Sequence, residues 1–133
     1  MTISADALFK AASAAMARSY APYSKFPVGA AIRDSNGNIH SGANIEVISF
    51  PEGWCAETTA IGHMIMAGAM QIVELAVVAE KLALCSPCGG CRQRLAEFSG
   101  PDTLVHLCDA EGVKKTVRMD ELLPMAFETQ VIG

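Results

Sequence analysis

Residues 72–80 read Ile-Val-Glu-Leu-Ala-Val-Val-Ala-Glu, a nearly continuous apolar run in the middle of a 133-residue chain. A strand that is apolar on both faces is typical of a central sheet position, because helices must then cover both sides of the sheet. The run is too short to span a bilayer. A chain of this length suits one domain with one core, so we expect residues 1–133 to form a single domain.

Turn and capping signals divide the rest of the chain into alternating elements. Asn36-Gly37 predicts a tight hairpin turn. The predicted strands cover residues 28–33, 39–44, 72–80, 103–108 and 113–119. The predicted helices cover residues 5–18, 55–69 and 87–98. Strands separated by one helix are expected to run parallel, so the order predicts a layered α/β domain around a mixed sheet.

Composition and charge exclude several classes of protein. Half of the residues are apolar and 18% are charged, which argues against disorder. The net charge is −4, and the lysines and arginines are scattered rather than gathered in a basic stripe. We therefore expect no nucleic-acid partner. No segment is apolar and long enough to span a membrane, and the first ten residues include Asp6 and lack the pattern of a signal peptide. The sequence predicts a cytoplasmic protein with no membrane partner.

The cysteines carry the strongest chemical signal. There are five, and an odd number without an export signal makes a disulfide framework improbable. Cys88 and Cys91 lie three residues apart at the start of a predicted helix, so both sulfur atoms can reach one ion. Cys55 begins another predicted helix and can supply a third thiolate. Three protein ligands leave one zinc position open for water, which is the arrangement of a catalytic site.

Other interpretations of these residues compete with a catalytic zinc site. A Cys-x-x-Cys pair can be a redox dithiol, but here Pro87 precedes the pair instead of lying inside it. It can also be half of a structural zinc site, but the second pair is missing. Glu57, two residues after Cys55, is either a first-turn carboxylate favoured by the helix dipole or an acid–base group beside the metal. We predict no zinc-ligand role for the histidines or for the remaining cysteines: His40, His63, His106, Cys85 and Cys108.

The combined pattern is a known signature. Zinc nucleobase deaminases carry His or Cys, any residue and Glu, followed later by Pro-Cys-x-x-Cys. Cys55-Ala56-Glu57 and Pro87 to Cys91 fit this pattern. The chain resembles the small, homotetrameric cytidine deaminases over nearly its whole length. The matching stretches are residues 21–30, 42–46, 55–57, 86–93 and 122–127.

The resemblance implies a fold, a cofactor and an activity. It implies a single catalytic domain over residues 1–133, a three-layer α-β-α sandwich with a mixed, roughly five-stranded sheet. It implies one zinc ion per chain, held by Cys55, Cys88 and Cys91. The implied reaction is hydrolysis of a C–N bond, which converts free cytidine and deoxycytidine to uridine and deoxyuridine plus ammonia in pyrimidine salvage. Zinc-bound hydroxide attacks C4 while Glu57 acts as proton shuttle.

The resemblance also implies substrate contacts. Asn44 and Glu46 match the pair that binds the ribose hydroxyls, chiefly the 3′-OH. Phe26 matches an aromatic residue that packs on the pyrimidine ring, and Ala56 matches a residue whose backbone contacts the base. Phe127 matches an aromatic residue inserted from a neighbouring subunit, so a homotetramer with shared sites is expected. For Phe26, Asn44 and Glu46, the simpler alternatives are a core side chain, a strand-end amide and a solvated carboxylate.

Two positions depart from the family pattern, and other substrates stay open. The family often has Arg where this chain has Thr58, and usually Asn where it has Val47. Arg92, directly after Cys91, either compensates in part for the missing arginine or is a surface residue. Blasticidin-type deaminases share the zinc motifs but lack the glutamate that Glu46 matches, which favours cytidine. Deamination of RNA or DNA bases is disfavoured by the acidic charge balance.

Overall fold

The computed structural model describes residues 2–81 and 85–126, which build one five-stranded mixed sheet. The strand order across the sheet is β2-β1-β3-β4-β5. The strands are β1 (Val28–Asp34), β2 (Ile39–Ala43), β3 (Ile72–Ala79), β4 (Ser99–Asp109) and β5 (Gly112–Arg118). The strand predicted from the apolar run therefore takes the central position, as expected.

Strand direction follows the predicted alternation of helices and strands. β1 is antiparallel to both of its neighbours, β2 and β3, so β2 and β3 point the same way. β3 and β4 are parallel neighbours joined through α3, and β4 and β5 are antiparallel. Both pairs of strands that are separated by one helix thus run in the same direction, which confirms the prediction.

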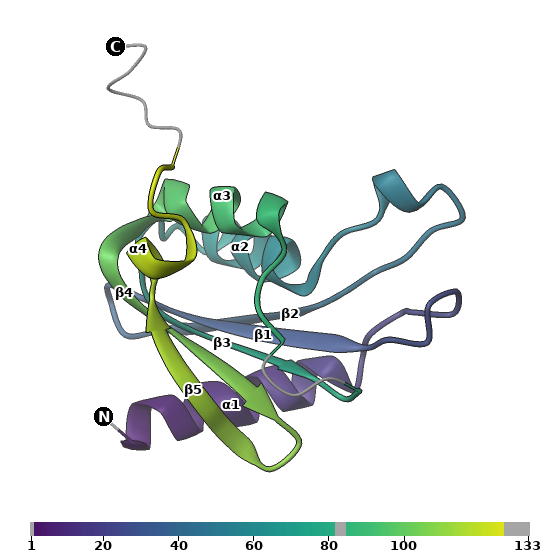
Figure 1. The fold of residues 1–133 in the computed structure, drawn as a ribbon, viewed down its shortest axis with the longest axis horizontal. Coiled ribbons are helices and arrows are strands. Elements are labelled where there is room, and N and C mark those ends of the chain that lie inside the picture. Colours follow the sequence, from purple (N-terminus) through teal and green to yellow (C-terminus); the bar gives the residue numbers. More distant parts are fainter. Residues whose placement is uncertain (1, 82–84, 127–133) are drawn as a thin grey trace.

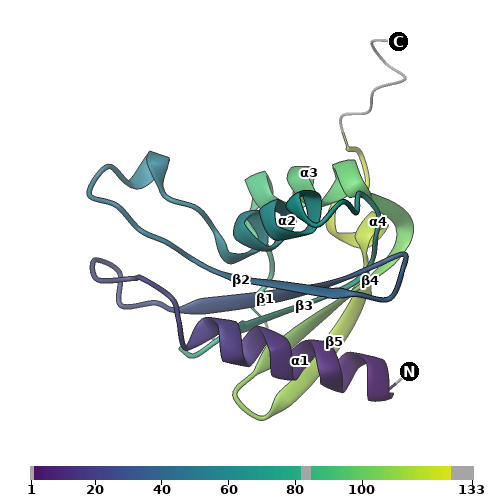
Figure 2. The same ribbon diagram turned by 180° about the vertical axis from the view of Figure 1, so that it is seen from behind.

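Helices cover both faces of the sheet, as Figures 1 and 2 show. α1 (Thr2–Met16) lies on one face, and α2 (Ala56–Met66) and α3 (Gly89–Phe98) lie on the other. Two short helices, η1 (Phe50–Glu52) and α4 (Met119–Leu122), complete the described elements. This is the predicted three-layer sandwich. Among the described residues, no helix combines the length and the apolar character needed to cross a membrane.

The core consists of two apolar layers, one on each side of β3. Leu75 and Val77 pack with Met64 and Leu95 from α2 and α3. Val78, from the opposite face of the strand, packs with residues of α1. All of these β3 side chains are at most 1% exposed. The doubly apolar run is therefore explained by helices on both faces.

Several element boundaries differ from the prediction by one to four residues, and those of β4 and α3 bear on the site. β4 begins at Ser99, four residues earlier than expected, because Ser99 pairs with Ile72 and the Thr103 hydroxyl donates to the Ile72 carbonyl at 3.0 Å. α3 begins at Gly89, with Cys88 as its N-cap in extended conformation. Pro87 was expected to open this helix, but it lies just before the cap.

Candidate metal centre and active site

The N-termini of α2 and α3 bring three cysteines together. Cys55 caps α2 and Cys88 caps α3, both with extended backbone, and Cys91 lies in the first turn of α3. Gly42 on β2 sets the position of α2. A Cβ atom at this residue would lie 2.5 Å from the Ala60 nitrogen and 2.8 Å from the Ala56 carbonyl oxygen. The backbone of α2 therefore rests directly on the strand.

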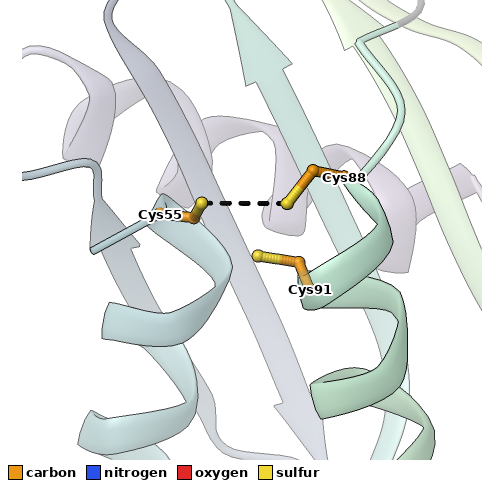
Figure 3. A group of neighbouring side chains, drawn as sticks. All are labelled: Cys55, Cys88 and Cys91. Atoms are coloured by element: carbon orange, nitrogen blue, oxygen red, sulfur yellow. Dashed lines mark hydrogen bonds between the residues drawn. The ribbon is translucent and has the colours of Figure 1, made fainter. Parts of the chain in front are cut away.

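The three sulfur atoms converge on one space, as Figure 3 shows. The Sγ atoms of Cys55, Cys88 and Cys91 all lie within 4.8 Å of one another, and those of Cys55 and Cys88 are 3.9 Å apart. A tetrahedral zinc ion with Zn–S bonds of about 2.3 Å separates its thiolates by roughly 3.8 Å. The donor set and its spacing therefore fit zinc, as the sequence predicted.

Within the part of the chain that the structure describes, no fourth ligand joins this cluster. The three histidines have other contacts. His40 Nε2 lies 2.7 Å from Asp34 Oδ2, His63 Nδ1 lies 2.6 Å from the Ser41 carbonyl oxygen, and His106 lies between Glu74 and Thr116. A cluster with three protein donors keeps the open position that catalysis requires.

The cysteine thiols influence one another's ionisation. The neighbouring Cys91 thiol lowers the pKa of Cys55, against burial and the negative charges of Cys88 and Glu57. The pKa of Cys91 is raised, chiefly by its hydrogen bond with Cys55 and then by burial. The Cys55 thiol therefore loses its proton more easily than an ordinary cysteine, and the Cys91 thiol loses its proton less easily, because two adjacent thiolates repel each other. A divalent cation removes this conflict.

Glu57 lies in the first turn of α2 and is 4% exposed. Burial raises the pKa of its carboxyl group above the ordinary value, while its own backbone N–H, the Cys91 thiol and the charge of Arg94 act in the opposite direction. A buried carboxyl group with a raised pKa, two residues from a metal ligand, is suited to accept and return protons.

Thr58 and Arg94 also contact the sulfur atom of Cys91. Thr58 Oγ1 and Arg94 Nη1 each lie 3.8 Å from Cys91 Sγ. Arg92 instead donates to the Ser86 hydroxyl and to the Pro87 and Leu122 carbonyls, at 2.8, 2.8 and 2.9 Å. We predicted from the sequence that Arg92 is either a partly compensating cation or a surface residue, and we did not consider Arg94, which is the arginine in contact with Cys91. The signal was present, since residues three apart on a helix are neighbours.

Asn44, predicted to contact ribose, holds the loop that precedes β1. Its Oδ1 accepts hydrogen bonds from the Val28 N–H at 2.9 Å and from the Ser19 hydroxyl. Its Nδ2 donates to the Phe26 carbonyl at 2.9 Å. Phe26 itself is half-buried. One amide therefore connects both ends of the segment that carries the predicted ring-packing residue.

Glu46 holds the middle of the same loop. Its Oε1 accepts the N–H groups of Tyr23 and Ser24, each at 3.1 Å, and its Oε2 accepts the Ser24 hydroxyl. These hydrogen bonds, the Ser24 hydroxyl first, hold the pKa of the Glu46 carboxyl below its ordinary value. Lys25, which follows, has φ of 58°, a left-handed conformation that costs a non-glycine residue about 1–2 kcal/mol. The loop is thus a constrained segment.

A short β-bridge connects the Asn44–Glu46 segment to the cysteine cluster. Ile45 and Trp54 exchange two backbone hydrogen bonds of 2.9 Å, and Cys55 follows Trp54 directly. Ala56, the predicted backbone contact to the base, is 1% exposed at the start of α2. Phe127, the predicted contribution from a neighbouring subunit, lies outside the described residues.

The match to a known family settles what kind of site this is. The family model of the cytidine and deoxycytidylate deaminase zinc-binding region matches residues 3–108. The chain belongs to this deaminase family. The deaminase is 41% identical to a cytidine deaminase from Halalkalibacterium halodurans, over 92% of this chain and 93% of that one. It is 34% identical to a cytidine deaminase from Mycobacterium tuberculosis, over 87% of this chain and 84% of that one.

Solved structures agree with the sequence matches. The structure of the deaminase superposes on the crystal structure of cytidine deaminase from Burkholderia pseudomallei with a TM-score of 0.86 and 39% identity, covering 91% of this chain and 97% of that one. The cytidine deaminase from Mycobacterium tuberculosis gives a TM-score of 0.82 and 34% identity, over 92% and 95% of the two chains. The predicted family, fold and zinc cofactor are confirmed.

Proposed function

We propose that the chain catalyses the hydrolytic deamination of free cytidine and deoxycytidine to uridine and deoxyuridine, with release of ammonia. The observation that carries this proposal is the three-cysteine cluster with the buried Glu57 two residues after its first ligand. The names of the relatives support cytidine as the substrate class. A role in pyrimidine salvage and a cytoplasmic location follow from such a substrate and stay predictions.

The cysteines and Glu57 would have separate roles in the reaction. Cys55, Cys88 and Cys91 would hold zinc, which supplies the Lewis acidity that makes water a nucleophile near neutral pH. Glu57 would accept a proton from that water through a carboxylate oxygen and deliver it to N3 of the cytosine ring. It would then accept the second proton, from the hydroxyl group added at C4, and pass it to the departing amine, which leaves as ammonia while N3 keeps the first proton.

Asn44 and Glu46 would recognise the sugar while they hold the 19–28 loop. An ionised carboxylate has about four acceptor positions, and three hydrogen bonds from Tyr23 and Ser24 leave capacity for a ribose hydroxyl. Asn44 Nδ2 has a second N–H beside the one that binds Phe26. A hydroxyl-binding pair of this kind strongly disfavours nucleosides that lack the hydroxyl.

The shape of the single chain supports a homotetramer with shared sites. Large apolar side chains are exposed on the segment before β1 and on the segment between β2 and α2: Tyr20, Tyr23, Ile45, Val47, Ile48 and Trp54. One hollow of about 490 Å³ lies beside α3 and α4, and another of about 810 Å³ lies beside α1 and β5; neither is lined by the three cysteines. A second copy of the chain would cover the apolar loops and enclose the site. Phe127 is our candidate for the residue that enters from that copy.

The test is the loss of cytidine and deoxycytidine absorbance in the ultraviolet, with zinc content measured for every variant. Glu57→Gln should retain zinc and lose activity by about a hundredfold or more. Glu97→Gln removes an exposed carboxylate on α3 and should leave both quantities unchanged. If the wild type holds zinc but leaves both nucleosides unchanged, the substrate assignment is wrong. Light scattering on dilution tests whether activity is lost together with the tetramer.

A further inference from the structure

The cysteine cluster concentrates negative charge at the start of α2 and α3. Zinc held by three thiolates remains formally anionic, and Glu57 adds to that charge when it is ionised. Cys55 and Cys88 are exposed, whereas Cys91 is fully buried and Glu57 nearly so, so water screens the charge least at Cys91 and Glu57. A buried anionic group is stable only if dipoles or a cation compensate it.

The helix dipoles supply only part of this compensation. Cys55 and Cys88 are N-caps, where the positive ends of α2 and α3 favour a thiolate. A helix terminus contributes about half an elementary charge, and each dipole faces its own cap residue. Cys91, the most buried of the three ligands, lies inside the first turn of α3 and faces side chains instead.

Arg94 places a cationic side chain against this buried sulfur. Its Nη1 donates toward Cys91 Sγ at 3.8 Å, from a position three residues further along the same helix face. Thr58 Oγ1 lies at the same distance from the same sulfur atom but is neutral. The guanidinium of Arg92 is directed to oxygen atoms of Ser86, Pro87 and Leu122.

Gly90 leaves room for the guanidinium over the first turn of α3. A Cβ atom at Gly90 would lie 3.3 Å from Arg94 Nη1 and 4.0 Å from its Cζ. The first of these distances is tighter than an ordinary van der Waals contact, so a methyl group there would push the end of the Arg94 side chain aside by a few tenths of an ångström. Gly90, which has no side chain, thus leaves space for the Arg94 guanidinium beside Cys91.

We propose that Arg94 is the cation that compensates the charge of the zinc-bearing cysteine cluster, acting through Cys91 from a position enabled by Gly90. Arg94 is a positioning and charge-compensating residue. It replaces the arginine that the family resemblance led us to expect at position 58. The proposal rests on the zinc site and not on the identity of the nucleoside.

The first experiment measures zinc affinity by chelator competition on the loaded protein at one fixed pH. Arg94→Gln should weaken zinc binding about 10–100-fold, the usual effect of removing a group that supports a ligand. In the cobalt-substituted protein, the thiolate-to-metal absorption band should move to lower energy, because Cys91 loses a charged hydrogen-bond donor. Gly90→Ala should produce the same changes to a smaller degree.

Variants that keep a positive charge near Cys91 but change the shape of the side chain show whether charge or shape matters. Arg94→Lys should retain most of the zinc affinity. The double variant Thr58→Arg/Arg94→Gln should restore much of the affinity and of the cobalt band, because the side chain of residue 58 lies against the same sulfur atom and would bring a cation to it from α2. Arg18→Gln removes an exposed arginine after α1 and should behave as the wild type.

Two results would overturn the proposal. One is a zinc affinity of Arg94→Gln within about twofold of the wild type with an unchanged cobalt band. The other is an equal loss of affinity in Arg94→Gln, Arg94→Lys and the relocated double variant, which would mean that shape and not charge matters. None of these readouts uses cytidine, so an error in the substrate assignment would be seen separately.

Discussion

The side-chain amide of Asn44 fixes the backbone of Phe26: Nδ2 donates to the Phe26 carbonyl at 2.9 Å. The other end of the same amide accepts the Val28 N–H and the Ser19 hydroxyl. Asn44 therefore has two roles that must be separated, since it organises the loop and is also the proposed contact to ribose.

Asn44→Ala should lower both stability and activity. The loop loses three hydrogen bonds, and half-buried backbone groups lose their partners, so the free energy of unfolding should fall by about 1–3 kcal/mol. The kcat/KM for cytidine should fall by about tenfold or more. Thermal unfolding and the ultraviolet assay measure the two effects. Asn36→Ala, in the exposed hairpin turn, is the matched control, and an Asn44→Ala protein with wild-type stability would contradict the structural role.

Glu46→Gln should weaken recognition of the sugar more than it disturbs the loop. Glutamine keeps an acceptor for the N–H groups of Tyr23 and Ser24 but lacks the charge. We expect kcat/KM for cytidine to fall about tenfold or more. The loss should be smaller for 2′,3′-dideoxycytidine, because this nucleoside lacks the ribose hydroxyls that Glu46 would bind, so removing the charge costs it no such contact.

The control for this prediction is Glu52→Gln, an exposed carboxylate in η1, which should leave both substrates unaffected. An equal loss on the two nucleosides would mean that Glu46 acts only through the loop.

The fold was largely predictable because its signals are local. Asn36-Gly37 specifies a hairpin by itself, and apolar side chains on both faces of β3 require helices on both sides of the sheet. The zinc ligands were predictable because Cys88 and Cys91 share a helical turn and Cys55-Ala56-Glu57 completes a known pattern.

Contacts between distant segments were not predictable in this way. No local pattern shows that Asn44 binds Ser19, Phe26 and Val28. The early start of β4 depends on a hydrogen bond between Thr103 and Ile72, 31 residues apart. In each case, a polar side chain satisfies backbone groups that only the folded chain brings near.

Asp34 makes the hairpin sensitive to acid. This carboxylate is 1% exposed, and it accepts the N–H groups of Asn36 and Asn38 while it contacts His40 at 2.7 Å. The hydrogen bond with His40, and then the backbone donors, hold the pKa of Asp34 below its ordinary value of 3.8. Because this pKa is lower in the folded than in the unfolded chain, the ionised Asp34 carboxylate stabilises the fold at pH values above 3.8. This stabilisation is lost as the pH falls through the lowered pKa.

Asp34→Asn should therefore be less stable than the wild type at neutral pH, and the difference should shrink in acid. Thermal midpoints measured from pH 7 to pH 3 test this, with Asp102→Asn, at an exposed position, as the control. A difference between wild type and Asp34→Asn that stays constant over this range would contradict the assignment.

Gly42→Ala should damage the metal site from a distance. The added Cβ would lie 2.5 Å from the Ala60 nitrogen, so α2 must move away from β2 and carry Cys55 and Glu57 with it. Overpacking of this kind costs about 1–3 kcal/mol. We expect a lower thermal midpoint, reduced zinc content and reduced activity. Wild-type values for all three quantities would show that α2 does not depend on this close contact.

Gly62→Ala is the matched change, made inside α2 itself. It should raise the thermal midpoint, whereas Gly42→Ala should lower it. A Cβ atom there would meet only Trp54 Cζ3, at 4.0 Å. Alanine also removes the entropic cost of a glycine in a helix interior, which is about 0.5–1 kcal/mol. We therefore expect the thermal midpoint to rise by a few degrees with zinc content and activity unchanged. A fall in the midpoint would indicate that α2 needs glycine at this position, and that the effect of Gly42→Ala is not specific to the contact with β2.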